Sequence, residues 1–541
     1  MRTPIRTHLA LLLVTGLVAG CAAHSPASSE VLERAATAAR DGASASRTLA
    51  FAGFHSWLVQ GDVATAQGRF DEAISKDPAE PYALYGHHLL ARRAAQPRRA
   101  LDAALAVVTR APRHPLAVPS ARYVLESVGV SPALDEVILT GLLAALDAGA
   151  AGEAAQLLRA AQLSVLAPRP DRAAQTQVLQ DLGAADTATL LGPFSARHLL
   201  TFDEPLAPEK DGSLAGPFTG PFGPLAPRIL HAPDSRLDIA GETSPGDVYL
   251  MAADVEVPEA GVYVVRGASA SSYKLMLDGQ PVLERRAFAR AASTVAARPM
   301  QLGAGRHRVL VKLLRDQRQA SVSVTLSRAD GRPAALRYSA ATGPAPAPWG
   351  SGPKEARAEL VYPRAEELSA ALAAEAGTLL ADFIAVRDGM SRDPDGSWRL
   401  MTRPAKLSQT PAVLSLRAEL AVQDRTIPSK VARGRATRDL EAVLARDTSD
   451  VVALMVRAEL SLGDNQPTTA LETLKAARKA ATPTGWPVLL MEARAAVALE
   501  LDSTAEESRR RRSRCSRACA RRRGCATTWP NAATRWRARM S

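Results

Sequence analysis

The sequence predicts an α+β multidomain protein in which two α-helical arrays flank an antiparallel β-sandwich. Residues 31–190 and 355–507 place apolar side chains three and four positions apart, as amphipathic helices do. Residues 236–340 instead contain short alternating or continuous apolar runs between turn residues, which is typical of strands. Two stretches rich in proline and glycine, 191–235 and 341–354, separate these parts. A chain of 541 residues is long enough for several such domains.

The positive charge of the chain is concentrated at its C-terminal end. The whole sequence has 67 lysines and arginines against 55 acidic residues, but residues 508–541 alone carry twelve arginines and no aspartate or glutamate. The rest of the chain is therefore balanced, with 55 basic residues against 55 acidic ones. This balance argues against a nucleic-acid-binding body, so no nucleic acid is expected as a partner.

The first twenty residues have the order of a secretory signal peptide. Arg2 and Arg6 precede an apolar run over residues 9–19, and small residues follow it. The run is too short to span a bilayer, which needs about 20 apolar residues. It ends in Val-Ala-Gly-Cys, which resembles the lipobox of bacterial lipoproteins.

This resemblance implies cleavage between Gly20 and Cys21 and the attachment of lipid, such as palmitate, through the Cys21 thiol. More than one acyl chain then holds the protein on a membrane. Ala22 follows, where many Gram-negative bacteria use aspartate to retain a lipoprotein at the inner membrane. The expected location is the bacterial cell envelope, anchored in the outer membrane and facing the periplasm, with residues 21–30 as a short tether.

A repeat lies within the first helical segment, where Trp57 is the large residue of the preceding helix. One set of positions recurs 34 residues later: Ala66, Phe70, Ala73 and Pro78 become Ala100, Ala104, Val107 and Pro112. This pattern resembles tetratricopeptide repeats, in which small residues let paired helices approach, an aromatic ring fills the gap and proline ends the second helix. The resemblance implies an α-solenoid whose grooves bind other envelope proteins.

The central segment contains seven expected strands. They cover residues 248–251, 255–257, 262–265, 273–277, 282–283, 308–314 and 322–326. Asp278-Gly279 predicts a two-residue hairpin turn, because both residues accept positive φ. Together with Gly261, Tyr263 and the segment 302–311, this hairpin resembles PA14-like and carbohydrate-binding β-sandwich modules. The resemblance implies a glycan partner, but Asp278 lacks the acidic neighbour with which PA14-like modules hold calcium, so no metal or other cofactor is expected.

A second array with the same period follows the Pro-rich linker. The positions Ala436 and Leu440 recur 34 residues later as Ala470 and Leu474. This segment also resembles tetratricopeptide repeats, in a weaker form, and we expect it to end near residue 507.

The arginine-rich tail has two interpretations. One is a functional basic arm for nucleic acid or anionic lipid, since arginine with interleaved tryptophan suits phosphate and stacking contacts. Three cysteines also lie within the tail. Their spacing lacks a Cys-x-x-Cys pair and a fourth ligand, which argues against a zinc site. The preferred interpretation is translation of a GC-rich gene in the wrong frame.

The sequence offers no catalytic residues that we can assign. It contains no GxSxG elbow, HExxH helix or GxxxxGK[ST] loop, and Cys21 is the only cysteine before residue 515. We therefore expect a protein-binding scaffold or assembly factor rather than an enzyme. One alternative is a glycan- or peptidoglycan-binding protein. Another is a truncated form of exported tetratricopeptide proteins that carry a C-terminal transglutaminase-like domain, whose order of domains this chain resembles.

Overall fold

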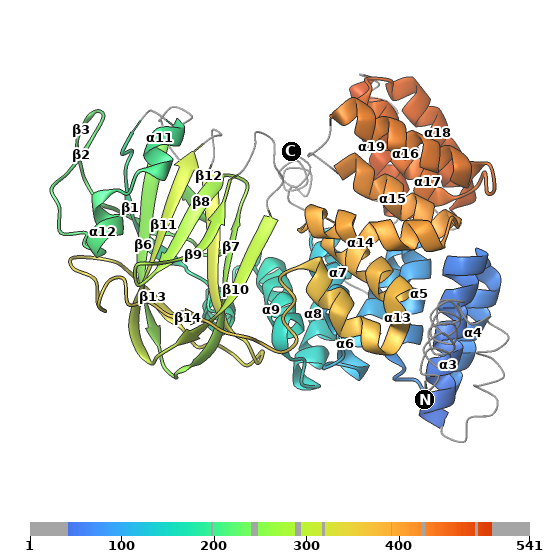
Figure 1. The fold of residues 1–541 in the computed structure, drawn as a ribbon, viewed down its shortest axis with the longest axis horizontal. Coiled ribbons are helices and arrows are strands. Elements are labelled where there is room, and N and C mark those ends of the chain that lie inside the picture. Colours follow the sequence, from blue (N-terminus) through green and yellow to red (C-terminus); the bar gives the residue numbers. More distant parts are fainter. Residues whose placement is uncertain are drawn as a thin grey trace, which may run out of the picture.

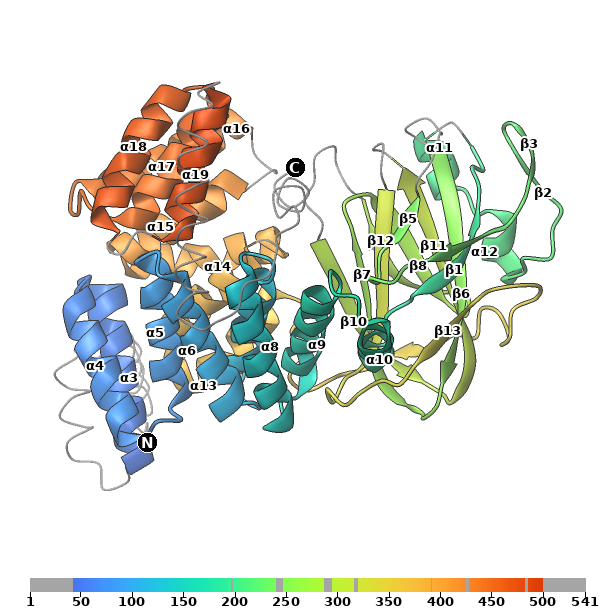
Figure 2. The same ribbon diagram turned by 180° about the vertical axis from the view of Figure 1, so that it is seen from behind.

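The computed structural model describes most of the chain as a mixed α+β protein. The described residues are 42–195, 198–239, 247–286, 294–315, 320–390, 392–423, 428–481 and 485–499. The predicted signal peptide, the tether with Cys21 and the arginine-rich tail lie outside them. Figures 1 and 2 show the strands at one end of the molecule and most of the helices at the other. The two helical segments, which flank the strands in sequence, therefore lie together on one side of them.

The first helical segment consists largely of antiparallel hairpins. Its elements are α3 (Gly42–His55), the π-helix η1 (Ser56–Gln60), α4 (Val63–Lys76), α5 (Pro81–Arg93), α6 (Pro97–Arg110), α7 (Ala117–Glu126), α8 (Pro132–Asp147), α9 (Gly152–Leu166) and α10 (Arg172–Leu182). The Phe70 ring of α4 lies between Gly53 of α3 and Gly86 of α5. A Cβ atom at these glycines would approach the ring to 2.7 and 2.5 Å. The absence of side chains at both positions thus makes room for the aromatic ring.

Local sequence explains where many of these helices begin. The side chains of Asp62, Ser131 and Asp171 accept hydrogen bonds from backbone N–H groups in the first turns of α4, α8 and α10. These bonds satisfy donors that have no partner within the helix. Proline begins α5, α6 and α8, where its missing N–H group costs no helical hydrogen bond.

The second helical segment packs against the first. Its helices are α13 (Ala365–Gly389), α14 (Pro394–Leu407), α15 (Pro411–Gln423), α16 (Ser429–Leu444), α17 (Val451–Gly463), α18 (Pro467–Ala480) and α19 (Trp486–Ala498). Leu368, Phe383 and Leu416 share one hydrophobic core with Trp57 and Leu89 of the first segment. The Trp57 and Phe383 rings meet edge to face with their centroids 5.6 Å apart. Helices more than 300 residues apart in sequence thus bury a common apolar surface.

Helix α13 is the one helix of the described residues that is long and apolar enough to cross a membrane. Half of its most apolar stretch is buried inside the fold, as in the core helix of a folded domain. Gly377 interrupts it with φ of +72°, a conformation that glycine adopts without steric cost.

The strands form two antiparallel sheets that face each other. The larger sheet has the order β4-β1-β6-β11-β8-β9, with β13 also paired to β6, and the smaller has the order β14-β10-β7-β12-β5. Their strands are β1 (Thr187–Leu191), β4 (Arg228–His231), β5 (Leu237–Ile239), β6 (Asp247–Val257), β7 (Gly261–Ser269), β8 (Ser272–Leu277), β9 (Gln280–Arg285), β10 (Thr294–Leu302), β11 (Gly305–Arg315), β12 (Ala320–Arg328), β13 (Arg337–Ala340) and β14 (Lys354–Glu355). One buried cluster contains Tyr249 and Val311 of the first sheet together with Val265 and Leu326 of the second.

The expected lead-in, residues 191–235, is more than an extended connection. It contains α11 (His198–Asp203), α12 (Ala207–Asp211), the hairpin β2 (Phe218–Gly220) and β3 (Gly223–Leu225), and strand β4. Phe202 and Leu214 cover the outer face of the larger sheet at Leu310 and Leu314. Since β1 already begins at Thr187, the sheets start before the expected boundary at residue 236.

Two buried cations of β11 hold this covering segment in place. The Arg308 guanidinium donates to both Asp254 carboxylate oxygens, at 2.8 and 3.0 Å, and to the carbonyl oxygens of Gly212, Thr342 and Gly343. Lys312 donates to Glu209 of α12 at 2.8 Å. Strand β11 is therefore buried on both faces, one apolar and one containing paired charges.

The Pro-rich linker, residues 341–354, lies against the larger sheet. The Trp349 indole donates to the Glu209 carbonyl oxygen at 2.9 Å, and its ring occupies the space beside Gly212 and Gly279. The linker then forms β14 on the edge of the smaller sheet. Its path directs the chain back to α13 and the other helices (Figure 1).

Hydrogen bonds from backbone and side-chain groups attach the sheets to α9 and α10. Gly183, which ends α10 with φ of +68°, accepts a hydrogen bond from the Leu326 N–H group at 2.8 Å. The side chains of Gln156 and Arg159 in α9 donate to the carbonyl oxygens of Arg328 and Gly331, both at 2.6 Å. Helix α9 thus contacts the strands directly.

Candidate functional site

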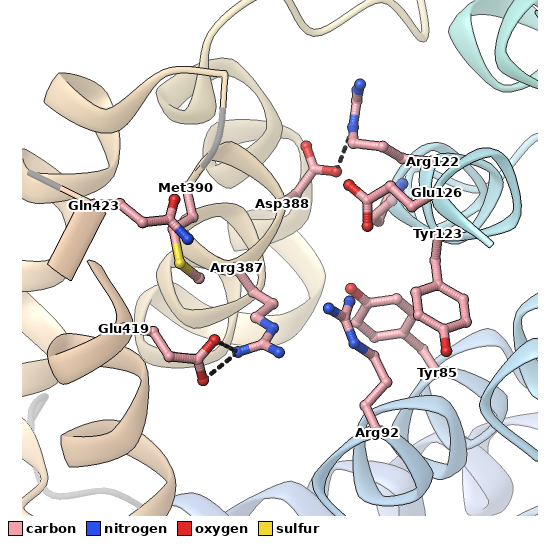
Figure 3. Close-up of a pocket in the computed structure, with 11 residues that line it drawn as sticks. Tyr85, Arg92, Arg122, Tyr123, Glu126, Arg387, Asp388, Met390, Glu419 and Gln423 are labelled. Atoms are coloured by element: carbon pink, nitrogen blue, oxygen red, sulfur yellow. Dashed lines mark hydrogen bonds and ion pairs between the residues drawn. The ribbon is translucent and has the colours of Figure 1, made fainter. Parts of the chain in front are cut away.

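The two helical segments meet at a cleft of about 200 Å³. Helices α5 and α7 form one side, and α13 and α15 form the other (Figure 3). The cleft is lined by Tyr85, Arg92, Pro119, Arg122, Tyr123, Glu126, Arg387, Asp388, Met390, Glu419 and Gln423. Charged and tyrosine side chains dominate, which is unusual for a junction between helices and makes this cleft the candidate functional site.

Helical spacing places these side chains on the faces that meet. Tyr85 and Arg92 are seven residues apart in α5, and Glu419 and Gln423 are four apart in α15. Side chains at these separations lie on one side of a helix. The same faces carry the apolar residues of the common core, so the charged side chains occupy the ends of otherwise apolar stripes.

Arg122 joins the two helical segments. Its guanidinium donates to the carboxylate of Glu153 in α9 and to that of Asp388 in α13, both at 2.8 Å. The second oxygen of Asp388 accepts from Arg392 at 2.7 Å, and the second oxygen of Glu153 accepts from the Tyr362 N–H group at 2.9 Å. The side chain of Asp388 is 1% exposed and that of Glu153 is 8% exposed. Both carboxylates are thus desolvated and satisfied.

The electrostatics of this network follow from burial and pairing. Burial alone would raise the pKa of Asp388, but the guanidinium groups of Arg122 and Arg392 outweigh it and lower the pKa. Burial and the same two arginines act in the same way on Glu153, whose pKa is also lowered. The two carboxylates are therefore charged at neutral pH and balance Arg122.

Arg387 and Arg92 face the open part of the cleft. The guanidinium of Arg387 donates to both oxygens of Glu419 at 2.8 Å. Arg92 lies over the Tyr123 ring, 4.8 Å from its centroid, and no carboxylate of the described residues forms an ion pair with it. Burial, followed by the charge of Arg387, lowers the pKa of Arg92. Figure 3 shows both guanidinium groups directed into the cleft.

A neutral histidine supports the Tyr123 ring from behind. The His88 ring centroid lies 4.6 Å from that of Tyr123, and His88 Nδ1 lies 2.9 Å from the Ala100 carbonyl oxygen. Because a carbonyl oxygen only accepts, the neutral ring carries its proton on Nδ1. Burial, with a smaller effect of Arg92, lowers the pKa of His88 to about 3. This histidine therefore positions an aromatic ring and does not transfer protons at neutral pH.

A second, smaller hollow of about 40 Å³ continues from the cleft. It shares Arg92, Arg387 and Glu419 with the first and adds Trp57 and Phe383. Next to it, Arg93 forms an ion pair with the buried Asp450, at the start of α17. The polar cleft thus borders an apolar floor made by the aromatic residues of both segments.

The residues predicted to pack the first array lie between its helices rather than in the cleft. Ala66, Phe70, Ala73, Ala100 and Ala104 are fully buried between helices.

The two prolines of that pattern, Pro78 and Pro112, lie in the turns after α4 and α6. Among the predicted packing residues, Trp57 is the one that lines a hollow.

The predicted positions of the second array lie farther from the cleft. Ala436 and Leu440 of α16, with Ala470 and Leu474 of α18, are buried in the hairpins that these helices form with their neighbours.

The predicted hairpin turn joins β8 and β9 in the larger sheet. Asp278 and Gly279 are its two connecting residues, with φ of +48° and +80°. One Asp278 oxygen accepts from the Arg308 N–H group, and the other lies 2.6 Å from His307 Nδ1. The carboxylate is occupied by these protein groups. Within the described residues there is no group of three or more histidine, cysteine or acidic side chains that could hold a metal ion.

The charged residues of the cleft were not among the residues predicted from sequence. Arg122 and Asp388 are 266 positions apart, so no local pattern joins them. The available signal was an arginine within an otherwise apolar helical face, as at Arg92 and Arg387. No protein-family model matches the chain, and no curated protein matches it.

Proposed function

We propose that this protein is a lipid-anchored scaffold of the bacterial cell envelope that binds other proteins at the cleft between its two helical segments. In this proposal the helical hairpins are a tetratricopeptide-like α-solenoid and the two facing sheets are a β-sandwich. The buried alanines at 34-residue spacing and the Phe70 ring between paired helices support the first assignment. The apolar cluster shared by the sheets supports the second.

One observation carries the binding role: helices from both helical segments surround a cleft in which some charged and polar side chains form no ion pair with other described residues. Arg92 has no ion-pair partner among the described carboxylates, and Gln423 is exposed at the rim. A purely structural junction would pair or exclude such groups, because a desolvated cation without a partner destabilises the fold. A partner that supplies the missing interactions is the simplest explanation for them.

The anchor is tested by replacing Cys21 with serine in cells that produce the protein. We expect the variant to leave the membrane fraction and to lose palmitate labelling, because serine has no thiol to modify. Unchanged fractionation and labelling would refute the anchor. Gly20→Trp, which obstructs cleavage before an intact Cys21, serves as a second variant and should accumulate the longer precursor.

The binding role is tested by photo-crosslinking in intact cells. A photoreactive residue at Gln423 on the rim of the cleft should form adducts with other envelope proteins. The same residue at Glu472, which is exposed on α18, serves as the control and should not form these adducts. Adducts at neither position, or the same adducts at both, would refute binding at the cleft.

The two alternative functions receive less support. Sugar binding commonly uses exposed aromatic rings, but Tyr249, Tyr263 and Tyr273 are buried within the sheets. Phe222, at the turn between β2 and β3, is the exposed aromatic ring of the described strand region. The truncated-enzyme alternative depends on residues after 507, and reading the gene in its other frames tests it. A frame that continues the repeats and reaches a cysteine, histidine and aspartate set would favour it.

A further inference from the structure

Two positively charged groups face each other across the cleft, and the exposed carboxylate of Glu126 at the rim acts on both. Arg92 extends from α5 and Arg387 from α13, and Figure 3 shows their guanidinium groups directed into the same space. Two like charges repel in a partly desolvated site. Such an arrangement is typical of a binding site whose ligand supplies an acceptor that the protein does not.

The charges of the cleft other than those of Arg92 and Glu126 are already paired. Arg122 is matched by Glu153 and Asp388, and Asp388 is also bonded to Arg392. Arg387 is bonded to Glu419 through one terminal nitrogen, and its other N–H groups have no hydrogen-bond acceptor among the described residues. Among the described residues of the lining, Arg92 is the cation without a carboxylate partner. The lining is balanced overall, with Arg92, Arg122 and Arg387 against Glu126, Asp388 and Glu419, but Arg92 has no carboxylate within ion-pair distance among the described residues.

We infer that the cleft binds one carboxylate group of a partner protein, held by the guanidinium groups of Arg92 and Arg387. This inference rests on the proposed protein-binding function and adds the chemistry of the group that is recognised. A planar carboxylate matches the paired N–H groups of arginine, whose hydrogen bonds to it are shorter and stronger than those between neutral groups.

A single carboxylate fits the charge and the size of the cleft better than phosphate does. Phosphate carries up to two negative charges at neutral pH, and Glu419 already neutralises Arg387. A volume of about 200 Å³ corresponds to roughly six or seven waters, which is enough for an acidic side chain. Burial raises the pKa of Tyr85 and of Tyr123, so both hydroxyl groups keep their protons at neutral pH.

Glu126 gives the inference a second, opposite test. This residue is exposed at the rim of the cleft and forms no ion pair within four ångströms among the described residues. Its charge repels an entering carboxylate while it attracts Arg92. Removing the charge should therefore strengthen binding, whereas removing the charge of Arg92 should weaken it.

The experiment is calorimetric titration of the full-length protein in detergent at constant ionic strength, with N-acetylglutamate amide as the probe. We expect binding of this probe but not of N-acetylglutamine amide, which has the same shape without the charge. Arg92→Gln should weaken binding by about tenfold or more, and Glu126→Gln should strengthen it by about two- to fivefold. Arg99→Gln, which removes an exposed arginine of α6, should change nothing. N-acetylglycine, tested in parallel, determines whether a chain terminus replaces the side-chain carboxylate.

Several results would overturn the inference. They are equal binding of the glutamine probe, stronger binding of inorganic phosphate, or no effect of Arg92→Gln. Because Arg92 forms no ion pair with a described carboxylate, Arg92→Gln should unfold at the same temperature as the wild type or at a higher one. If this variant does not fold, the stronger binding expected of Glu126→Gln tests the inference in its place. Failure of every carboxylate probe while Gln423 still forms specific crosslinks would refute the ligand chemistry and leave the proposed function intact.

Discussion

Replacing Arg122 by glutamine should loosen the attachment of the second helical segment to the first. The change removes the cation that joins Glu153 of α9 to Asp388 of α13, each at 2.8 Å. Removing one partner of a buried ion pair costs about 3–5 kcal/mol, because the other charge stays in the interior. Asp388 keeps Arg392, and Glu153 keeps a backbone N–H group. We therefore expect the lower end of that range, about 3 kcal/mol.

Hydrogen–deuterium exchange of the α13 backbone amides is the assay. A protein with several domains need not unfold in one step, so a single melting temperature would not report on this junction. Exchange measures the local opening free energy directly. A loss of about 3 kcal/mol corresponds to a decrease in protection of about a hundredfold. The exchange of strand β11, which lies in the larger sheet, should change little.

Glu375→Gln is the matched control. It removes the ion pairs that Glu375 forms with Arg47 at 3.2 Å and with His114 at 3.5 Å, between the same helical segments, but the side chains of Glu375 and Arg47 are at least 40% exposed. Such a pair contributes less than about 1 kcal/mol. Equal effects of Arg122→Gln and Glu375→Gln, or a change below about fivefold for Arg122→Gln, would refute the reasoning. Adding Glu153→Gln to Arg122→Gln should restore part of the protection, because it neutralises a carboxylate that the first change leaves buried.

Further predictions concern the same junction, the larger sheet and the first hairpins. The carboxylates that Arg122 joins have lowered pKa values, so their stabilisation is present at neutral pH and should be lost below about pH 4, as each is protonated. Urea unfolding between pH 7 and 3 should show this loss of stability, and a smaller loss in Arg122→Gln. Arg308→Gln should destabilise the sheets by about 3 kcal/mol or more, measured by the same unfolding, because the buried Arg308 guanidinium makes five hydrogen bonds. Gly86→Ala should destabilise the first hairpins by about 1–3 kcal/mol, since its Cβ atom would meet the Phe70 ring at 2.5 Å. Gly68→Ala, where nothing lies within 4 Å, should instead stabilise α4 by up to about 1 kcal/mol in the same measurement.

Local patterns in the sequence were sufficient to predict the mixed α+β class. The helical segments have clear 3.6-residue periodicity, and Asp278-Gly279 lies in the two-residue connection of a hairpin. Boundaries between strands were harder to predict. The expected strands 248–251 and 255–257 are one continuous strand, β6, because the intervening residues 252–254 keep the extended conformation while pairing with β11.

The covering of the larger sheet could not be predicted from a two-sheet pattern. Such a pattern expects one apolar and one polar face on each strand. In β11 the outer face alternates Arg308, Leu310, Lys312 and Leu314, all of which are buried under the lead-in segment. A cation between two leucines on one face of a strand is a signal that this face is covered and that acceptors lie above it. The acceptors come from distant parts of the chain: Gly212 and Glu209 lie about 100 residues earlier, Asp254 lies 54 residues before Arg308, and Thr342 and Gly343 lie in the linker after it.

The cleft depends on all three parts of the chain, although it is lined by helices alone. The sheets return the chain through the linker and β14 to Tyr362, whose N–H group donates to Glu153. Val264 of β7 and Val361 share a small apolar cluster, which fixes the point at which the second segment leaves the sheets. The direction of α13, and with it the position of Arg387 opposite Arg92, is thereby set by contacts with the strands as well as with α7 and α9. A fragment containing one helical segment would lack half of the lining, so binding measured on such a fragment would say nothing about the cleft. Under the proposed function the sheets contribute to recognition without lining the cleft, since they hold its two halves at a fixed separation.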